Sequence, residues 1–133
     1  MPLHATGPFE VKLSPQPADE RPDTANLGRL LIDKRFHGDL EATSKGQMLT
    51  AGTSTKGSAG YVAIEQVTGT LHGRSGGFIL MHTGTMTRGA PQLAVSVVPD
   101  SGTGELRGLS GRMTITVASD GGHSYDFEFR LES

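Results

Sequence analysis

A glutamate and a lysine each lie among apolar neighbours in segments that alternate like β-strands. Glu65 shares one face of the segment Tyr61–Leu71 with apolar side chains, and Lys34 stands between Ile32 and Phe36 at i±2. Strand alternation therefore aims both charges at the inner side of a sheet. Burying either charge without a partner would be costly, so we expect the two side chains to pair on the same side of the sheet. A structural ion pair and a polar cavity usable for chemistry both remain open.

If that cavity is catalytic, acid–base chemistry is what these residue types supply. Glu65 would be the general base or a charge stabiliser, Tyr125 a hydroxyl donor, and His82 or His123 a proton shuttle. For both histidines, a core position with satisfied polar contacts is the alternative. The ligand cavity itself is expected to include Lys34, Tyr61, Phe78 and Phe127.

Three kinds of function fit these residues. The first is a cofactor-free isomerase, cyclase or lyase acting on a small, mainly apolar molecule, and the second is a binding protein without catalysis. The third is a structural or interaction protein whose interior is filled by side chains. A solvent-connected cavity lined by Glu65 and Tyr125 would favour the first two, and a packed interior would exclude both.

Other chemical motifs are weaker. Gly73–Gly77 matches the G-x-S-x-G pattern of a hydrolase nucleophile, but a strand-like apolar run comes after it where that motif needs a helix. Asp100–Gly104 could form an anion-binding nest, although a tight turn explains it better. The chain has no cysteine, and its five histidines have no metal-binding spacing. The sequence therefore predicts no metal and no cofactor.

Charge and composition limit the partners. The formal net charge is −2, and the 12 lysines and arginines are dispersed, which argues against nucleic acid or an anionic membrane surface as a partner. No apolar run approaches the roughly 18 residues that span a bilayer, and the start shows no secretory leader. A single cytoplasmic domain covering residues 1–133 is the expectation.

The elements that must position these residues are strands. Alternation and β-forming residues predict eight: Thr6–Leu13, Gly28–Glu41, Gln47–Thr53, Tyr61–Leu71, Gly77–Thr87, Gln92–Val98, Arg112–Ala118 and Gly122–Glu132. No segment is convincingly helical. Residues 15–27 are rich in proline and are expected to form a loop.

A glycine-containing repeat separates several of these strands. Residues 69–76 and 104–111 both have the pattern G-x-L-x-G-x-S-G, and residues 38–44 form a weaker third copy. Glycine permits positive φ or close backbone approach, so we interpret each copy as a place where a strand bends into its neighbour.

Eight antiparallel strands can close into a barrel with no exposed edge, and we favour an eight-stranded antiparallel β-barrel over a sandwich. A monomeric barrel needs only one apolar face. Residues 61–64 and 78–81 are apolar on both faces, since Val62 and Ile64 oppose Tyr61 and Ala63, and Ile79 and Met81 oppose Phe78 and Leu80. The extra apolar face predicts a homo-oligomer.

Several stretches together resemble a known family. They are 34–40, 61–65, 69–78, His82, 101–111 and 122–127. The chain resembles the bacterial domain-of-unknown-function family 3224 from about Thr6 onward, with Ala42 where that family usually has glycine. More distantly, the glycine hairpin at 101–111 is similar to that of allene oxide cyclases and dirigent proteins. This second resemblance implies an eight-stranded, commonly oligomeric barrel and assigns no site residue.

Overall fold

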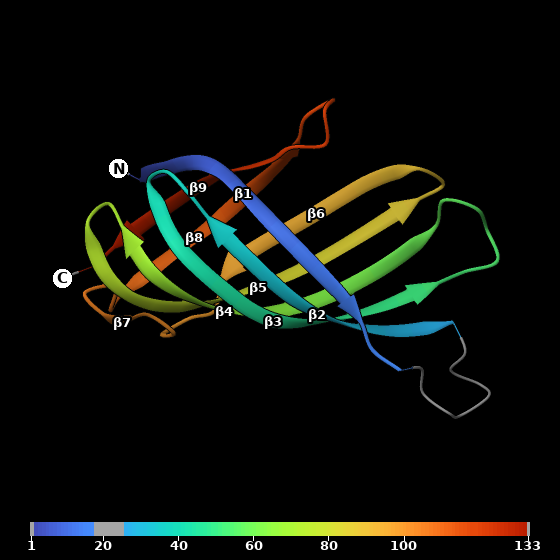
Figure 1. Ribbon diagram of the computed structural model, residues 1–133, viewed down its shortest axis with the longest axis horizontal. Coiled ribbons are helices and arrows are strands. Elements are labelled where there is room, and N and C mark those ends of the chain that lie inside the picture. The colour runs from blue at the N-terminus through green and yellow to red at the C-terminus, as the bar shows by residue number, and fades with distance from the viewer. Residues whose placement is uncertain (1, 18–25, 133) are drawn as a thin grey trace.

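The described part of the chain, residues 2–17 and 26–132 of a computed structural model, consists of strands, turns and loops (Figure 1). The strands are β1 (Leu3–Pro15), β2 (Leu27–Phe36), β3 (Leu40–Gly52), β4 (Ala59–Leu71), β5 (Arg74–Thr87), β6 (Ala90–Val97), β7 (Thr103–Gly104), β8 (Leu109–Val117) and β9 (His123–Leu131). A search of the described residues for a helix long and apolar enough to cross a membrane finds none.

Eight of the strands close into an antiparallel barrel. The hydrogen-bonded order is β4-β3-β2-β1-β9-β8-β6-β5, and pairing between β4 and β5 completes the circle. The short strand β7 lies outside the barrel and pairs with β5 at Gly76 and Gly77. The predicted fold class is confirmed.

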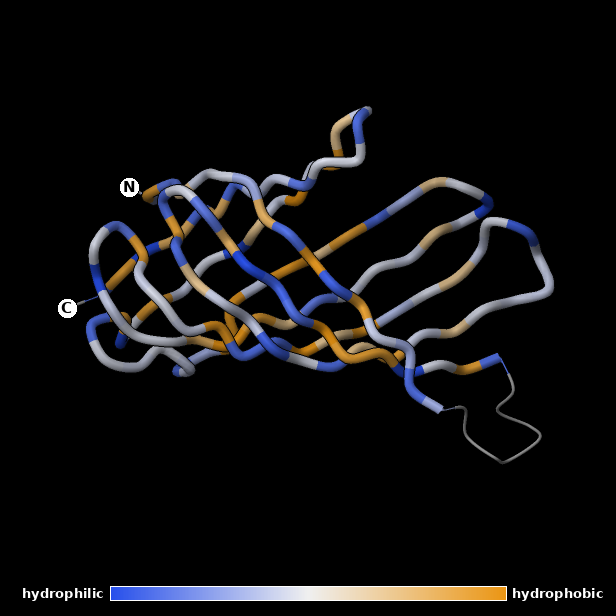
Figure 2. The backbone as a smooth tube through the Cα atoms, viewed as in Figure 1, coloured by the Kyte–Doolittle hydropathy of each residue, from blue (hydrophilic) through white to orange (hydrophobic). Residues whose placement is uncertain are grey.

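Side chains alternate between the inside and the outside of this barrel. Figure 2 shows the corresponding alternation of hydrophobic and hydrophilic residues along the strands. On β4, Ala63, Glu65 and Val67 are buried while Ile64 and Gln66 between them are exposed. The inner face is thus the one that carries Glu65, because burial has the period of two that a strand imposes.

One end of the barrel is closed by leucines. Leu40 and Leu71 face each other across β3 and β4, and Leu106 enters from the loop after β7. All three are 1% exposed. Each is the leucine of one copy of the G-x-L repeat, so the repeat places three leucines in one apolar plug.

The opposite end of the barrel is open. β6 and β8 pair only at Val95 with Met113 and at Ser96 with Arg112, and beyond these positions the two strands diverge (Figure 1). The β3–β4 and β5–β6 hairpins project past this point. Met86 and Leu93, whose places in the alternation direct them inward, are 43% and 42% exposed.

The predicted strand Gly28–Glu41 is wrong in one respect, because a turn divides it into the end of β2 and the start of β3. Gly38 has φ of 95° in that turn, which favours glycine. Phe36 and Leu40 flank the turn at an even spacing and both point inward, so the alternation continues across it and conceals the break.

Two other differences concern the extent of the strands. β3 begins seven residues before the predicted Gln47, since Leu40 belongs to it, and the short strand β7 is absent from the prediction. Of the predicted proline-rich loop at 15–27, residues 18–25 lie outside the described residues; Pro15 ends β1 and Leu27 begins β2.

Candidate functional site

The predicted pairing of Lys34 with Glu65 is confirmed. Lys34 on β2 and Glu65 on β4 reach across β3, and the Nζ atom lies 2.8 Å from Oε2 of the carboxylate. The exposed fractions of the two side chains are 7% and 0%. The β1–β2 register is continuous from Phe36 to Leu30, so no β-bulge in these two strands turns Lys34 outward.

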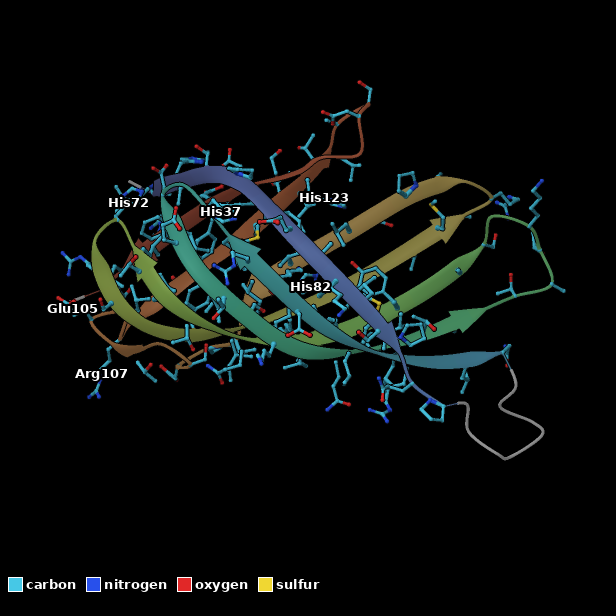
Figure 3. The ribbon with its side chains drawn as sticks, in the orientation of Figure 1. His37, His72, His82, Glu105, Arg107 and His123 are labelled. Carbon is cyan, nitrogen blue, oxygen red and sulfur yellow. The ribbon has the colours of Figure 1, made fainter. Side chains whose placement is uncertain are left out.

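Two further side chains contact the Glu65 carboxylate. The Ser44 hydroxyl donates a hydrogen bond to Oε1 at 2.6 Å, and Nε2 of His82 touches Oε2. Nε2 makes no hydrogen bond elsewhere in the described chain. Figure 3 shows His82 midway along the barrel, distant from His37 and His72 at the closed end. We call Lys34, Ser44, Glu65 and His82 the buried polar cluster.

These contacts hold the carboxylate in its ionised form. Burial alone would raise the pKa of Glu65, but the bond with His82 and the positive charge of Lys34 outweigh it and lower the pKa to about 2. A general base works best with a pKa near the working pH. Glu65 is therefore better suited to holding its neighbours in place than to accepting a proton.

Aromatic rings complete the surroundings of Lys34. Its ammonium lies 5.3 Å from the ring centroid of Phe9 and 5.9 Å from that of Phe36. Both distances are within the range of cation–π attraction. Carboxylate and rings together leave this ammonium fixed rather than free to bind an anion.

Tyr125 does not contact the buried polar cluster, and backbone groups already hydrogen-bond to its hydroxyl. Its hydroxyl donates to the Leu40 carbonyl at 3.2 Å or the His37 carbonyl at 2.7 Å, and it accepts from the Leu40 amide at 2.9 Å. Burial raises the pKa of Tyr125. These bonds satisfy the backbone of the turn between β2 and β3, so the hydroxyl has a structural task at the closed end.

The other predicted site residues are also apart from the cluster. The ring centroid of His123 lies 5.2 Å from that of Phe9, at the start of β9. Phe78 and Phe127 are buried and stack at 5.7 Å, and Phe127 also stacks on Phe129. These phenylalanines fill the interior between the buried polar cluster and the leucine plug.

A cavity of about 560 Å³ opens on the inner face at the open end. Met48, Tyr61, Met86 and Leu93 supply large side chains to its lining, together with smaller residues of β3 to β6. Tyr61 links this cavity to the cluster, because its ring centroid lies 6.5 Å from that of His82. We call this space the mouth cavity.

The ring of Tyr61 packs against the backbone of Gly84. Gly84 is directly opposite Tyr61 across β4 and β5, and any Cβ at Gly84 would collide with the ring. The ring can lie against the backbone only because Gly84 has no side chain. Burial raises the pKa of Tyr61, and the nearby charge of Glu65 raises it further, so the hydroxyl is neutral at physiological pH.

Comparison with known proteins then identifies the family. Residues 5–129 match the family described as "Protein of unknown function (DUF3224)". The chain belongs to the DUF3224 family. A solved structure of a family member from Shewanella oneidensis MR-1, itself titled as having unknown function, is 51% identical, with a TM-score of 0.92 over 100% of this chain and 99% of that one. No curated protein matches.

Membership in this family agrees with the residues on which the sequence resemblance rested, while the likeness to allene oxide cyclases remains a prediction. Of the predicted site residues, the fold brings together Lys34, Glu65 and His82, with Tyr61 beside them. The sequence did not single out Ser44, because the residues before Gln47 were not assigned to their own strand. The described residues include no group of three or more histidine, aspartate or glutamate side chains placed to hold a metal ion.

Proposed function

We propose that this DUF3224 protein binds a small, mainly apolar molecule in the mouth cavity. The observation that carries the proposal is that cavity, at about 560 Å³ and with a mostly apolar lining. Small-molecule sites commonly measure about 300–1,000 Å³ and combine apolar walls with a few polar groups. Met86 and Leu93 are apolar, point inward and are still more than two-fifths exposed. A ligand between the walls would remove that surface from water.

We favour binding over catalysis. A cofactor-free isomerase, cyclase or lyase would need a proton acceptor, and Glu65 with its pKa of about 2 is a weak one. The Tyr125 hydroxyl, the predicted proton donor, is held by backbone groups at the other end of the barrel. The buried polar cluster then has a structural role next to the mouth cavity, with Tyr61 between the two.

The test uses N-phenyl-1-naphthylamine, an uncharged dye whose fluorescence rises in apolar surroundings. We expect saturable binding to the wild-type protein, with one site per chain. Leu93→Asp, which places a charge on the inner wall, should raise Kd at least tenfold. Leu49→Asp is the matched control, because Leu49 is a similarly exposed leucine on the outer side of β3.

Two results would refute the proposal. One is the absence of saturable dye binding to the wild-type protein. The other is an equal loss of binding in Leu49→Asp, which would place the dye on the outside of the barrel. Thermal unfolding of both variants checks that each is folded, and both substitutions are at exposed positions where this is expected.

We also propose that the chain forms a homo-oligomer. Leu49, Val62, Ile64 and Met81 form an apolar outer face on β3, β4 and β5, with Leu49 opposite Val62 and Ile64 opposite Met81. Each of the four is exposed in the single chain. Contiguous apolar surface of this kind is typical of protein interfaces.

A further inference from the structure

The mouth cavity has an uncharged wall. Of the described residues that line it, none is lysine, arginine, aspartate, glutamate or histidine, and Tyr61 is the one titratable side chain. Thr50 and Tyr61 are at inner positions of their strands and carry hydroxyl groups. A ligand in this cavity therefore meets apolar groups and neutral hydrogen-bonding groups.

The charges of the buried polar cluster, next to Tyr61, are already balanced. The ammonium of Lys34 is 2.8 Å from the Glu65 carboxylate, whose other oxygen accepts from Ser44 at 2.6 Å. The remaining contact of the carboxylate is with His82. An anion entering from the mouth would find the ammonium neutralised, and a cation would find the carboxylate equally committed.

An ion in such a cavity loses water without gaining a counter-charge. Transferring an ionised carboxylate or ammonium into a poorly hydrated site is strongly unfavourable unless it is paired. A neutral carbonyl or hydroxyl loses far less hydration, and one hydrogen bond compensates for most of it. Tyr61 lines the cavity and carries the neutral hydroxyl that would make that bond.

We propose that the ligand of the mouth cavity is electrically neutral, an apolar body carrying a carbonyl or hydroxyl group that the Tyr61 hydroxyl binds. The inference rests on the proposed function and narrows it. It separates this barrel from those that bind carboxylates such as fatty acids, or amines. The specificity follows from the charges that the wall lacks as much as from the groups that it contains.

Three naphthalenes of similar size test the charge preference by competition with N-phenyl-1-naphthylamine at pH 7. They are 2-acetylnaphthalene, which is neutral, 2-naphthoate, which is an anion, and 2-(aminomethyl)naphthalene, which is a cation. We expect the neutral ketone to bind the wild-type protein at least tenfold more tightly than either ion. Tyr61→Phe should weaken the ketone about fivefold and leave 2-ethylnaphthalene unchanged.

A matched pair of methionines shows whether the missing counter-charge is the reason. Met86 and Met81 lie on the same strand and are 43% and 42% exposed, but they face opposite sides of the wall. Met86→Lys should strengthen 2-naphthoate binding at least tenfold and weaken the amine. Met81→Lys should change neither.

The outcomes separate the two proposals. If the wild-type protein binds 2-naphthoate as tightly as the ketone, or if Met86→Lys leaves naphthoate binding unchanged, the neutral-ligand inference is overturned while binding in the cavity stands. If the dye and all three naphthalenes fail to bind, the proposed function itself is refuted. A gain of naphthoate binding in Met81→Lys equal to that in Met86→Lys would overturn the inference by placing the site outside the barrel.

Discussion

Glu65 is fully buried and ionised, and its three partners come from three different strands. Lys34 lies on β2, Ser44 on β3 and His82 on β5. Each partner makes a polar contact with the Glu65 carboxylate, which would be costly to bury without such contacts. The cluster therefore fixes the relative positions of four neighbouring strands, and Tyr61 connects it to the mouth cavity.

Lys34→Met should be strongly destabilising because it leaves the carboxylate without its positive partner. Loss of one partner from a buried ion pair costs about 3–5 kcal/mol, and we expect about 3 here because Ser44 and His82 remain. Urea unfolding gives the free energy. The double variant Lys34→Met/Glu65→Gln should return to within about 1 kcal/mol of wild type, since the uncompensated charge is gone. A wild-type midpoint for Lys34→Met would contradict the expectation.

Acid should weaken the fold through Glu65. Its pKa is lowered from 4.5 in an unperturbed carboxyl to about 2, so the stabilisation is complete above about pH 4.5 and is lost as pH falls towards 2. Unfolding free energy measured between pH 6 and pH 2 should therefore fall less steeply in Glu65→Gln than in wild type. Glu10→Gln, at an exposed carboxyl paired with His37, is the control and should keep the wild-type slope. Equal slopes for Glu65→Gln and wild type would show that acid acts on other groups.

Among the elements, the glycine repeat serves the closed end of the barrel. The copies at 38 and 69 lie at hairpin turns, whereas the copy at 104 leads through a loop to β8. All of them contain a leucine that enters the barrel. Each copy of the repeat thus places a leucine in the closed end of the barrel, although the backbone forms a hairpin turn at two copies and a loop at the third.

The plug leucines should be far more sensitive to truncation than an exposed leucine. Leu71→Ala and Leu106→Ala each remove a buried side chain and should cost about 2–5 kcal/mol, as large-to-small core substitutions do. Leu27→Ala, at a leucine that is 47% exposed and does not belong to the apolar outer face, should change the unfolding free energy by less than about 0.5 kcal/mol. Chemical denaturation compares the three. Equal effects at Leu106 and Leu27 would mean that Leu106 does not pack into the closed end.

The barrel as a whole has two apolar surfaces with different shapes. The inner surface at the open end forms a cavity, which suits a small molecule. The outer face on β3 to β5 is exposed and broad enough to involve three strands. A protein partner suits this outer face better, and a second copy of the chain is the partner that we propose.

Sedimentation equilibrium at micromolar concentration should therefore give a mass of at least two chains. Ile64→Lys, which puts a charge in the middle of the outer face, should shift the protein towards monomer because burying an unpaired charge is unfavourable. Dye binding should survive in this variant, since the mouth cavity is on the other side of the wall. A monomeric wild-type protein would defeat the prediction.

The strands, the barrel and the inner position of Lys34 and Glu65 could all be predicted from the sequence. These features depend on the alternation of apolar and polar residues with a period of two, which can be seen in a short segment of sequence. The misplaced strand Gly28–Glu41 shows the limit of that signal, because Phe36 and Leu40 are four residues apart and the alternation continues across the turn at Gly38.

Which groups meet inside the barrel depends on the tertiary structure. The sequence offered both His82 and Tyr125 as companions of Glu65; the strand register brings His82 to the carboxylate and Tyr125 to the turn at the closed end. The mouth cavity likewise depends on where β6 and β8 part. Alternation says which side of the wall a residue faces, but its depth along the barrel depends on strand stagger, which is set by pairings between distant segments.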